Sequence, residues 1–376
     1  MKLDFFCLFV IILNAIFKLK NRIMILTNEM LEAALRFRSI CLWEELTDSD
    51  VFAFRLSDGE TGYCSVMGNA GEHFSLGFYR GKNGFSSYLK TLDMGRQQSF
   101  GCETFETVMT FDCINCDFVA ASTLDDTTKK RIRKYVNDAG LKISRSNGWP
   151  DFTRFEPYKA QYGITCEKDA RDITEALRAA IAVSEKLTIH DFESLGFDKR
   201  GAYPTAKGSK LVPYLIPTAD GTYEWSTVKL PALVQDKYAT VKFENDILVN
   251  MVKALPASCI LQLRIIHIPT PVNDGVSEVP YFPAVLICID ADSEYLWPIF
   301  CKEDFEKNPI LILVELADTF RRNAGKPQKM QVEDAKTEAL LEDFCRQCSI
   351  VLVREQNLSA LNEAWVSLLD NFMSFS

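Results

Sequence analysis

The chain has 376 residues, more than one hydrophobic core usually serves, so the length favours two domains. Apolar residues make up 47% and charged residues 25% of the sequence, the balance of a folded globular protein. The net charge of −9 and the isoelectric point of about 5.1 argue against broad affinity for nucleic acid, because phosphate binding needs a concentrated basic surface.

The N-terminus carries an apolar run at residues 5–17, which is shorter than the roughly 20 residues that a membrane-spanning helix needs. Lysine and arginine follow this run where an exported protein has a small-residue cleavage site. We interpret residues 1–23 as an apolar leader, with a membrane anchor as one alternative, or as a mis-annotated start, and we expect no stable membrane span. The twelve cysteines lack the dense spacing of a secreted disulfide scaffold, which favours reduced thiols and a cytoplasmic location.

The sequence pattern of residues 24–235 predicts an α+β domain. Short turns such as Ser57-Asp58-Gly59 join the early strands, and this pattern is typical of an antiparallel meander flanked by helices. The expected helices are residues 30–43, 85–92, 122–138 and 169–186. The expected strands are residues 51–56, 62–67, 74–80, 106–111, 117–121, 211–216 and 223–230. Pro150 and Pro157 indicate a surface connection at residues 144–163, and Pro213 predicts an edge strand.

A boundary near residues 231–237 begins a C-terminal α/β domain, residues 236–376. Residues 284–289 form a continuous apolar run, typical of a strand buried on both faces. The expected elements are a helix at 244–255, strands at 259–268, 284–289 and 295–300, a helix at 308–325, a strand at 328–333, a helix at 335–348, a strand at 349–354 and a helix at 359–372. From the strand pair onward the order is ββαβαβα, and helical crossovers imply adjacent parallel strands.

Acidic residues follow the ends of two strands in this domain. Asp290 and Asp292 follow the first strand of the pair, and Glu333 and Asp334 follow a later one. Such carboxylates could share magnesium or manganese, because hard cations prefer several oxygen ligands. The segments CIDADSEYLW, GKPQKMQVED and FCRQCSIVLV resemble, in order, the ribonuclease H-like core of integrases and transposases. The resemblance implies metal-binding acids at Asp290 and at Glu333 or Asp334, although Ala335 stands where that superfamily has a glycine. Alternatively, these acids cap helices and turns.

The stretch at residues 62–81 is the other distinctive one. Its segment SVMGNAGEH is similar to the N-terminal module of a family of uncharacterised bacterial proteins, in which a C-terminal domain of unknown function follows. This resemblance implies no activity. Gly68 and Gly71 would let backbone amides converge on an anion, with Glu72, His73 and Tyr79 beside them as polar groups. Alternatively, the glycines permit a tight connection and His73 is structural.

Cysteine and histidine give weaker signals elsewhere. Two C-x-x-C pairs, at residues 113–116 and 345–348, have the spacing of zinc or redox sites, but they fall in different domains. Cys64 and His73 would form a nucleophile–base pair without a third, orienting residue. His267 lies in an apolar run and is expected to pack within a strand. No phosphate-binding loop or dinucleotide fingerprint is present in the sequence.

The sequence therefore predicts a non-catalytic binding or interaction module that needs no cofactor, with unidentified partners. The alternative is a divalent-metal-dependent phosphoesterase or nuclease that uses Asp290, Asp292 and Asp334. The two hypotheses demand different geometries. The enzyme needs the carboxylates of Asp290 and Asp334 at one edge of a sheet, whereas the binding module needs a ligand site near residues 68–73 and Tyr79.

Overall fold

The computed structural model of the chain describes residues 24–71, 73–97, 102–198, 203–205, 207–273, 279–297, 300–301 and 308–374. Its contacts divide the chain into two compact units. The first unit holds the chain up to Ser99 together with Thr110–Val234, and the second holds Phe100–Met109 and Gln235–Ser376. Each unit is a mixed α/β structure built on one sheet.

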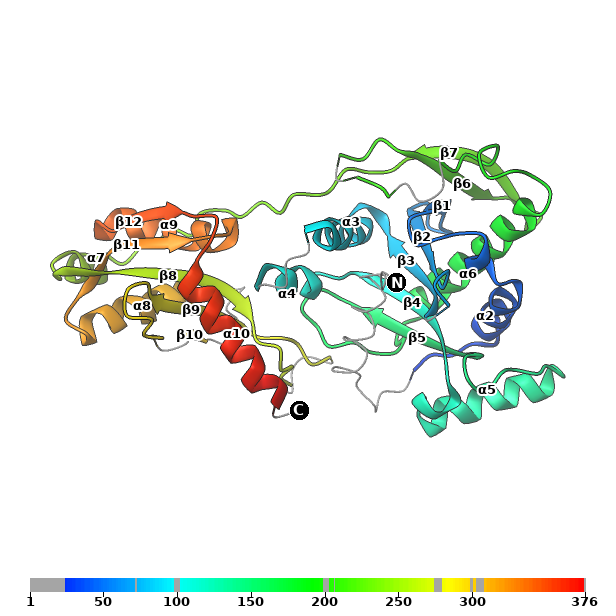
Figure 1. The fold of residues 1–376 in the computed structure, drawn as a ribbon, viewed down its shortest axis with the longest axis horizontal. Helices are drawn as coiled ribbons and strands as arrows, with labels where there is room; N and C mark the ends of the chain where they lie inside the picture. Colours follow the sequence, from blue (N-terminus) through cyan, green and yellow to red (C-terminus); the bar gives the residue numbers. More distant parts are fainter. Residues whose placement is uncertain are drawn as a thin grey trace. The chain divides into compact units, whose positions relative to one another are not determined.

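The first unit is built on a seven-stranded sheet with the order β5-β4-β3-β2-β1-β6-β7 (Figure 1). Strands β1 to β5 pair antiparallel in chain order, from the β1–β2 pair to the β4–β5 pair. Strand β6 then joins β1 in parallel and pairs antiparallel with β7. The strands are β1 (Phe52–Arg55), β2 (Thr61–Met67), β3 (Phe74–Arg80), β4 (Cys113–Val119), β5 (Trp149–Phe155), β6 (Leu211–Pro217) and β7 (Tyr223–Lys229).

Helices and short turns surround this sheet. They are α2 (Asn28–Ile40), η1 (Leu42–Glu44), α3 (Gly81–Gln97), η2 (Ala121–Thr123), α5 (Asp126–Asp138) and α6 (Glu167–Leu187). Capping side chains fix where two of the helices begin. The hydroxyl of Thr27 accepts the amide of Met30 at the start of α2, and the carboxylate of Asp125 accepts two amides at the start of α5.

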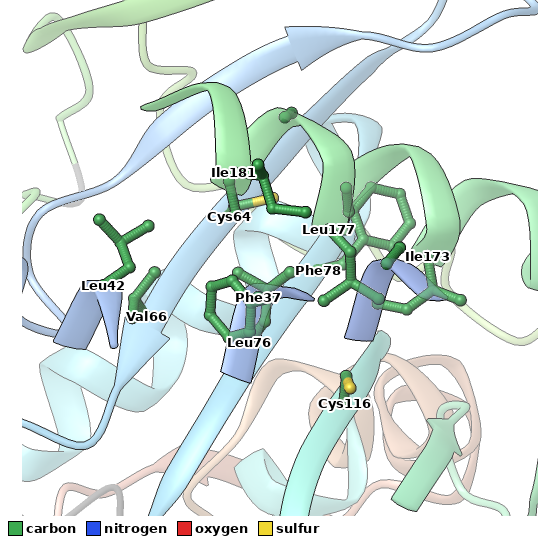
Figure 2. Packing of buried hydrophobic residues seen from close by; sticks show 14 of the residues in the cluster. Phe37, Leu42, Cys64, Val66, Leu76, Phe78, Cys116, Ile173, Leu177 and Ile181 are labelled. Carbon is green, nitrogen blue, oxygen red and sulfur yellow. The ribbon is translucent and has the colours of Figure 1, made fainter. Parts of the chain in front are cut away.

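The core of the first unit lies between one face of the sheet and the helices α2 and α6. Figure 2 shows Ile173, Leu177 and Ile181, three α6 residues one helical turn apart, in this core together with Phe78 of β3. Alternate residues of β2, β3 and β4 contribute to it, because successive side chains of a strand point to opposite faces. One face of the sheet is therefore an ordinary apolar core.

Three expectations for residues 24–235 are wrong. Residues 106–111 are not a strand, since they include the end of helix α4 (Cys102–Met109), whose apolar Phe105, Val108 and Met109 recur at helical spacing. Residues 144–163 are not a surface connection. They contain β5, where Pro150 is tolerated because β5 is an edge strand of the sheet. Strand β6 is flanked on both sides, so β7 and not β6 is the edge.

The second unit is built on a five-stranded sheet with the order β10-β9-β8-β11-β12. Strand β9 runs antiparallel to β8 and β10, whereas β11 runs parallel to β8 and β12. The strands are β8 (Ala257–His267), β9 (Ala284–Asp290), β10 (Phe300–Cys301), β11 (Lys326–Val332) and β12 (Val351–Arg354), and the helices besides α4 are α7 (Asp246–Lys253), α8 (Ile310–Arg322), α9 (Ala335–Cys348) and α10 (Ser359–Ser374). None of the helices within the described ranges is long and apolar enough to cross a membrane.

A buried lysine joins two helix ends in the second unit. The side chain of Lys326, at the start of β11, is 6% exposed. Its ammonium group donates to the backbone oxygen of Lys253 in α7 (3.0 Å) and to that of Cys348 in α9 (2.8 Å). A positive charge at the C-terminal end of a helix is favoured by the helix dipole and satisfies carbonyls that lack a partner within the helix.

We predict that Lys326→Met destabilises the second unit by about 2 kcal/mol, because the apolar stem is kept while two carbonyls at helix ends lose their donor, one of them buried. Chemical denaturation followed by circular dichroism measures the change. The matched control is Lys329→Met on the same strand, where the lysine is half-buried, and this change should stay within about 0.5 kcal/mol. Equal effects of the two substitutions would contradict the capping role of Lys326.

Candidate functional site

The second face of the first sheet, away from α2 and α6, carries a row of polar residues. Ser65, Gly77, Asn115 and Thr153 are direct cross-strand neighbours on β2, β3, β4 and β5. The three side chains in this row are at most 2% exposed. A buried sheet face is usually apolar, so a buried polar row needs an explanation beyond packing.

A second polar row lies beside the first. Ser75, Asp117 and Asp151 are cross-strand neighbours on β3, β4 and β5, and all three are at most 6% exposed. Two carboxylates thus stand directly opposite each other on a buried face. Such a pair destabilises a sheet unless cations or hydrogen-bond donors offset the repulsion.

His73 and Ser75 supply two such donors to Asp117. The Nε2 atom of His73 lies 3.1 Å from Oδ1 of Asp117, and the hydroxyl of Ser75 donates to the same oxygen at 2.5 Å. Burial opposes the charged imidazolium, but the hydrogen bond to Asp117 and its negative charge outweigh burial and raise the pKa of His73 above its ordinary value. The acid therefore favours the protonated form of His73.

Three polar groups of this face have no hydrogen-bond partner among the described residues. They are the hydroxyl of Tyr79, the hydroxyl of Thr153 and both amide atoms of Gln161. These side chains are 1%, 2% and 3% exposed. Tyr162 pairs with Arg154 beside β5, so these two residues share one face of the sheet. Their neighbours Gln161 and Thr153 therefore point to the other face. Each such group costs about 1–3 kcal/mol when it is buried without a partner.

Gly77 makes room for the side chain of Tyr79 at the middle of the face. A Cβ atom on this residue would lie 3.2 Å from the hydroxyl oxygen of Tyr79 and 3.5 Å from Oδ1 of Asn115. The hydroxyl of Tyr79 therefore reaches back along β3 toward Asn115. Burial raises the pKa of Tyr79 well above its ordinary value, so this hydroxyl keeps its proton and can act as a donor.

The arrangement of Asp117, His73 and Ser75 differs from that of a nucleophilic triad. In a triad the histidine bridges the acid and the hydroxyl. Here the acid accepts from both, and the serine proton is donated to Asp117. The cluster can therefore orient donors and acceptors around a ligand, but it supplies no base to the serine oxygen.

The structure treats the five predicted ligand-binding residues differently. His73 and Tyr79 lie on the second face at the two ends of β3. Gly68 belongs to the β2–β3 connection, where its φ of +136° and the rings of Trp43 and Phe74 leave no room for a Cβ. Gly71 uses its amide within the turn, where it donates to the backbone oxygen of Gly68 at 2.9 Å. Glu72 lies outside the described residues.

The structure does not bring the predicted metal-binding acids together. Asp290 and Met330 both face Leu261 of β8, from opposite sides, and Asp334 lies four residues beyond Met330. Asp290 and Asp334 are thus separated by two strand spacings across the sheet and by about 13 Å along the strands. This is far more than the distance that one cation can bridge. The reason is that β9 runs antiparallel to β8, whereas β11 runs parallel to it.

These acids serve the local fold. The carboxylate of Asp290 accepts the amides of Asp292 and Ser293. Partial burial opposes its charge, but these hydrogen bonds outweigh burial and lower the pKa of Asp290. Asp334 caps the start of α9 by accepting the amide and the hydroxyl of Thr337. The third acid, Glu333, pairs with Arg264 at 2.5 Å.

The surroundings of the remaining cysteine and histidine candidates also favour a structural role. Cys64 lies in the apolar core, on the opposite face of the sheet from His73. Burial raises the pKa of the Cys348 thiol to about 11, which does not favour a thiolate ligand. The imidazole Nδ1 of His267 lies 2.8 Å from Oε2 of Glu106 in α4. Within the described ranges, no three His, Cys, Asp or Glu side chains are grouped to hold a metal ion.

Comparison with protein families places both halves of the chain. Residues 28–200 match the model of a domain of unknown function, DUF7309, and residues 248–369 match that of a second domain of unknown function, DUF6930. The chain combines two domains of unknown function. No curated protein matches it. The polar face lies within the first match. Its β5 residues were missed because residues 144–163 were interpreted as a surface connection, and its β4 residues because alternating polar positions in a strand are also typical of a solvated face.

We predict that the stabilising effect of His73 depends on pH. Its pKa is raised in the folded state, so its contribution is complete below the unfolded value of about 6.5 and is lost as pH rises through the folded pKa. His73→Gln should therefore cost more unfolding free energy at pH 5.5 than at pH 9, by about 1 kcal/mol or more. Urea denaturation at the two pH values measures this.

The control for this experiment is the same substitution in an Asp117→Asn background. Without the carboxylate of Asp117, His73 loses the group that raises its pKa, and the pH dependence of the His73→Gln effect should shrink or disappear. A His73→Gln cost that is the same at both pH values in the parent protein would show that no charged pair forms.

Proposed function

We propose that this protein is a non-catalytic binding module whose first domain holds a small polar molecule on the second face of its sheet. The observation that carries the proposal is the set of buried, unpartnered groups at the centre of that face: the hydroxyls of Tyr79 and Thr153 and the amide of Gln161. Buried polar groups without partners are rare in proteins and cluster where a ligand completes them.

The chemistry of the face indicates what this ligand presents. Of the two carboxylate oxygens of Asp117, Oδ1 accepts the side-chain hydrogen bonds from the described residues. The other oxygen, Oδ2, is left for a ligand. Oδ2 of Asp117 and the amide oxygen of Gln161 thus offer two acceptors on this face. A ligand rich in hydrogen-bond donors, such as a small amine that also carries hydroxyl groups, satisfies this set best.

No observation favours the alternative of a divalent-metal phosphoesterase that uses Asp290, Asp292 and Asp334. Asp290 and Asp334 are separated by the antiparallel course of β9, and the carboxylates of these two residues already accept local backbone amides. The donors that Asp117 receives from His73 and Ser75 likewise suit binding better than nucleophilic chemistry.

Two further expectations belong to this proposal. A relationship of the second unit to the ribonuclease H-like fold is supported by three antiparallel strands, β8 to β10, followed by two parallel strands reached through helices. A cytoplasmic location is supported by the buried thiols of Cys64, Cys116 and Cys288, each free and each with a pKa raised by burial.

We predict that Thr153→Val leaves the ligand-free protein as stable as the parent or more stable, by up to about 1–2 kcal/mol, because it removes a buried hydroxyl without a partner. Ser75→Ala is the matched change in the neighbouring row. It should destabilise by about 1 kcal/mol, because it removes a hydrogen bond to the buried carboxylate of Asp117. Both values come from chemical denaturation.

Binding is tested on the same proteins by thermal shift. The probes are ethanolamine, serinol and putrescine, with glycerol and acetate as compounds that lack the amine. The proposal expects an amine to raise the melting temperature of the parent and the rise to shrink in the double variant Tyr79→Phe/Thr153→Val. Strong destabilisation of Thr153→Val, or no response of the parent to any amine, would contradict it.

A further inference from the structure

A cavity of about 710 Å³ lies in the first unit between the ends of α2 and α5 and the loop that follows α5. Its volume is in the range of small-molecule sites, about 300–1,000 Å³. The lining includes Leu35, Leu141 and Ile143, which give it an apolar wall. The side chain of Leu141 is 45% exposed, so this wall is open to an incoming ligand.

A guanidinium group without a counter-ion lines the cavity. Arg38 is half-buried, and no carboxylate of the described residues lies within ion-pair distance of it. Its Nε and Nη2 atoms donate to the backbone oxygen and the side-chain oxygen of Asn147, at 2.9 Å and 3.2 Å. A half-buried charge that is balanced only by neutral groups is costly, which makes an anionic ligand favourable.

Aromatic rings hold this guanidinium in place. Its central carbon lies 4.9 Å from the ring centres of Trp43 and Phe74 and 5.9 Å from that of Phe118. Among the described residues, Nη1 donates to the sulfur of Cys41 alone, at 3.8 Å, and Cys41 also lines the cavity. Arg38 is therefore pre-organised, with one donor nitrogen left for a ligand.

Lys142 adds a second positive charge to the lining. It is exposed and has no ion-pair partner within the described ranges. A third cation, Arg36, already pairs with Glu185, and Glu32 is the acid in the lining. Against this single acid, Arg38 and Lys142 give the cavity a net attraction for anions.

We propose that this cavity is a second binding site, for an amphipathic anion with an apolar chain or ring and one carboxylate. The carboxylate would bind Nη1 of Arg38 with Lys142 beside it, and the apolar part would lie against Leu35, Leu141 and Ile143. This site is separate from the polar face of the sheet and requires nothing of the ligand proposed there.

Isothermal titration calorimetry with decanoate, below its micelle concentration, tests this site on the full chain. Decanol lacks the charge and decyltrimethylammonium reverses it. We expect decanoate to bind with a dissociation constant below about 1 mM and the other two at least about tenfold more weakly. Absence of decanoate binding, or equal affinity for decanol, would overturn the proposal.

Variants locate the binding. Lys142→Glu changes an exposed residue and should weaken decanoate binding about tenfold or more, whereas Lys134→Glu, an exposed change on α5 outside the cavity lining, should leave it within about twofold. Arg38→Gln should abolish binding while circular dichroism confirms the fold. Thr153→Val should have no effect, which separates this site from the polar face. Unchanged affinity in Lys142→Glu would refute the site.

Discussion

The burial of polar side chains on the second face of the first sheet is the constraint on which this account depends. On the other face, Leu76, Phe78 and their neighbours pack against α2 and α6 in an ordinary apolar core. On the second face, the same strands bury Asn115, Asp117 and Thr153. A polar group in such a place must be paired within the chain or with a ligand, because otherwise its lost hydration is not offset. Part of the face is paired, through His73, Ser75 and Asp117, and part of it is not.

This division separates folding from binding within one sheet. The paired acid and the glycine-containing β2–β3 connection set the geometry of β3, whereas the unpartnered hydroxyls add nothing to stability. Proteins retain such groups where function requires them, at some loss of stability. The cavity beside Arg38 has the same character, because its cation is held rigidly by Asn147 and aromatic rings but has no acid to balance it. Both sites are thus places where the fold leaves polar chemistry incomplete.

Local patterns predicted much of the fold. The Ser57-Asp58-Gly59 turn, the apolar run of β9 and the helix begun at Asn308-Pro309 could all be found in the sequence, because each depends on neighbouring residues. Helix α4 was predicted as a strand because it has only eight residues and its Phe105, Thr107 and Val108 favour strands, which outweighed the helical spacing of its apolar residues. The course of β9 relative to β11 could not be predicted either, since β8 lies between them in the sheet. This is why Asp290 and Asp334 were expected to meet.

The site was predictable only in part, for the same reason. His73 and Tyr79 stand out in a distinctive stretch, but Asn115, Thr153 and Gln161 reach the face through pairings between distant strands. The most direct measurement is a crystal structure of the protein, purified without denaturant, from crystals grown with ethanolamine. The account predicts density for a small molecule within about 2.6–3.2 Å of the Tyr79 and Thr153 hydroxyls. If these hydroxyls instead bond to other side chains of the chain, or face apolar packing, the second face is structural and the central claim fails.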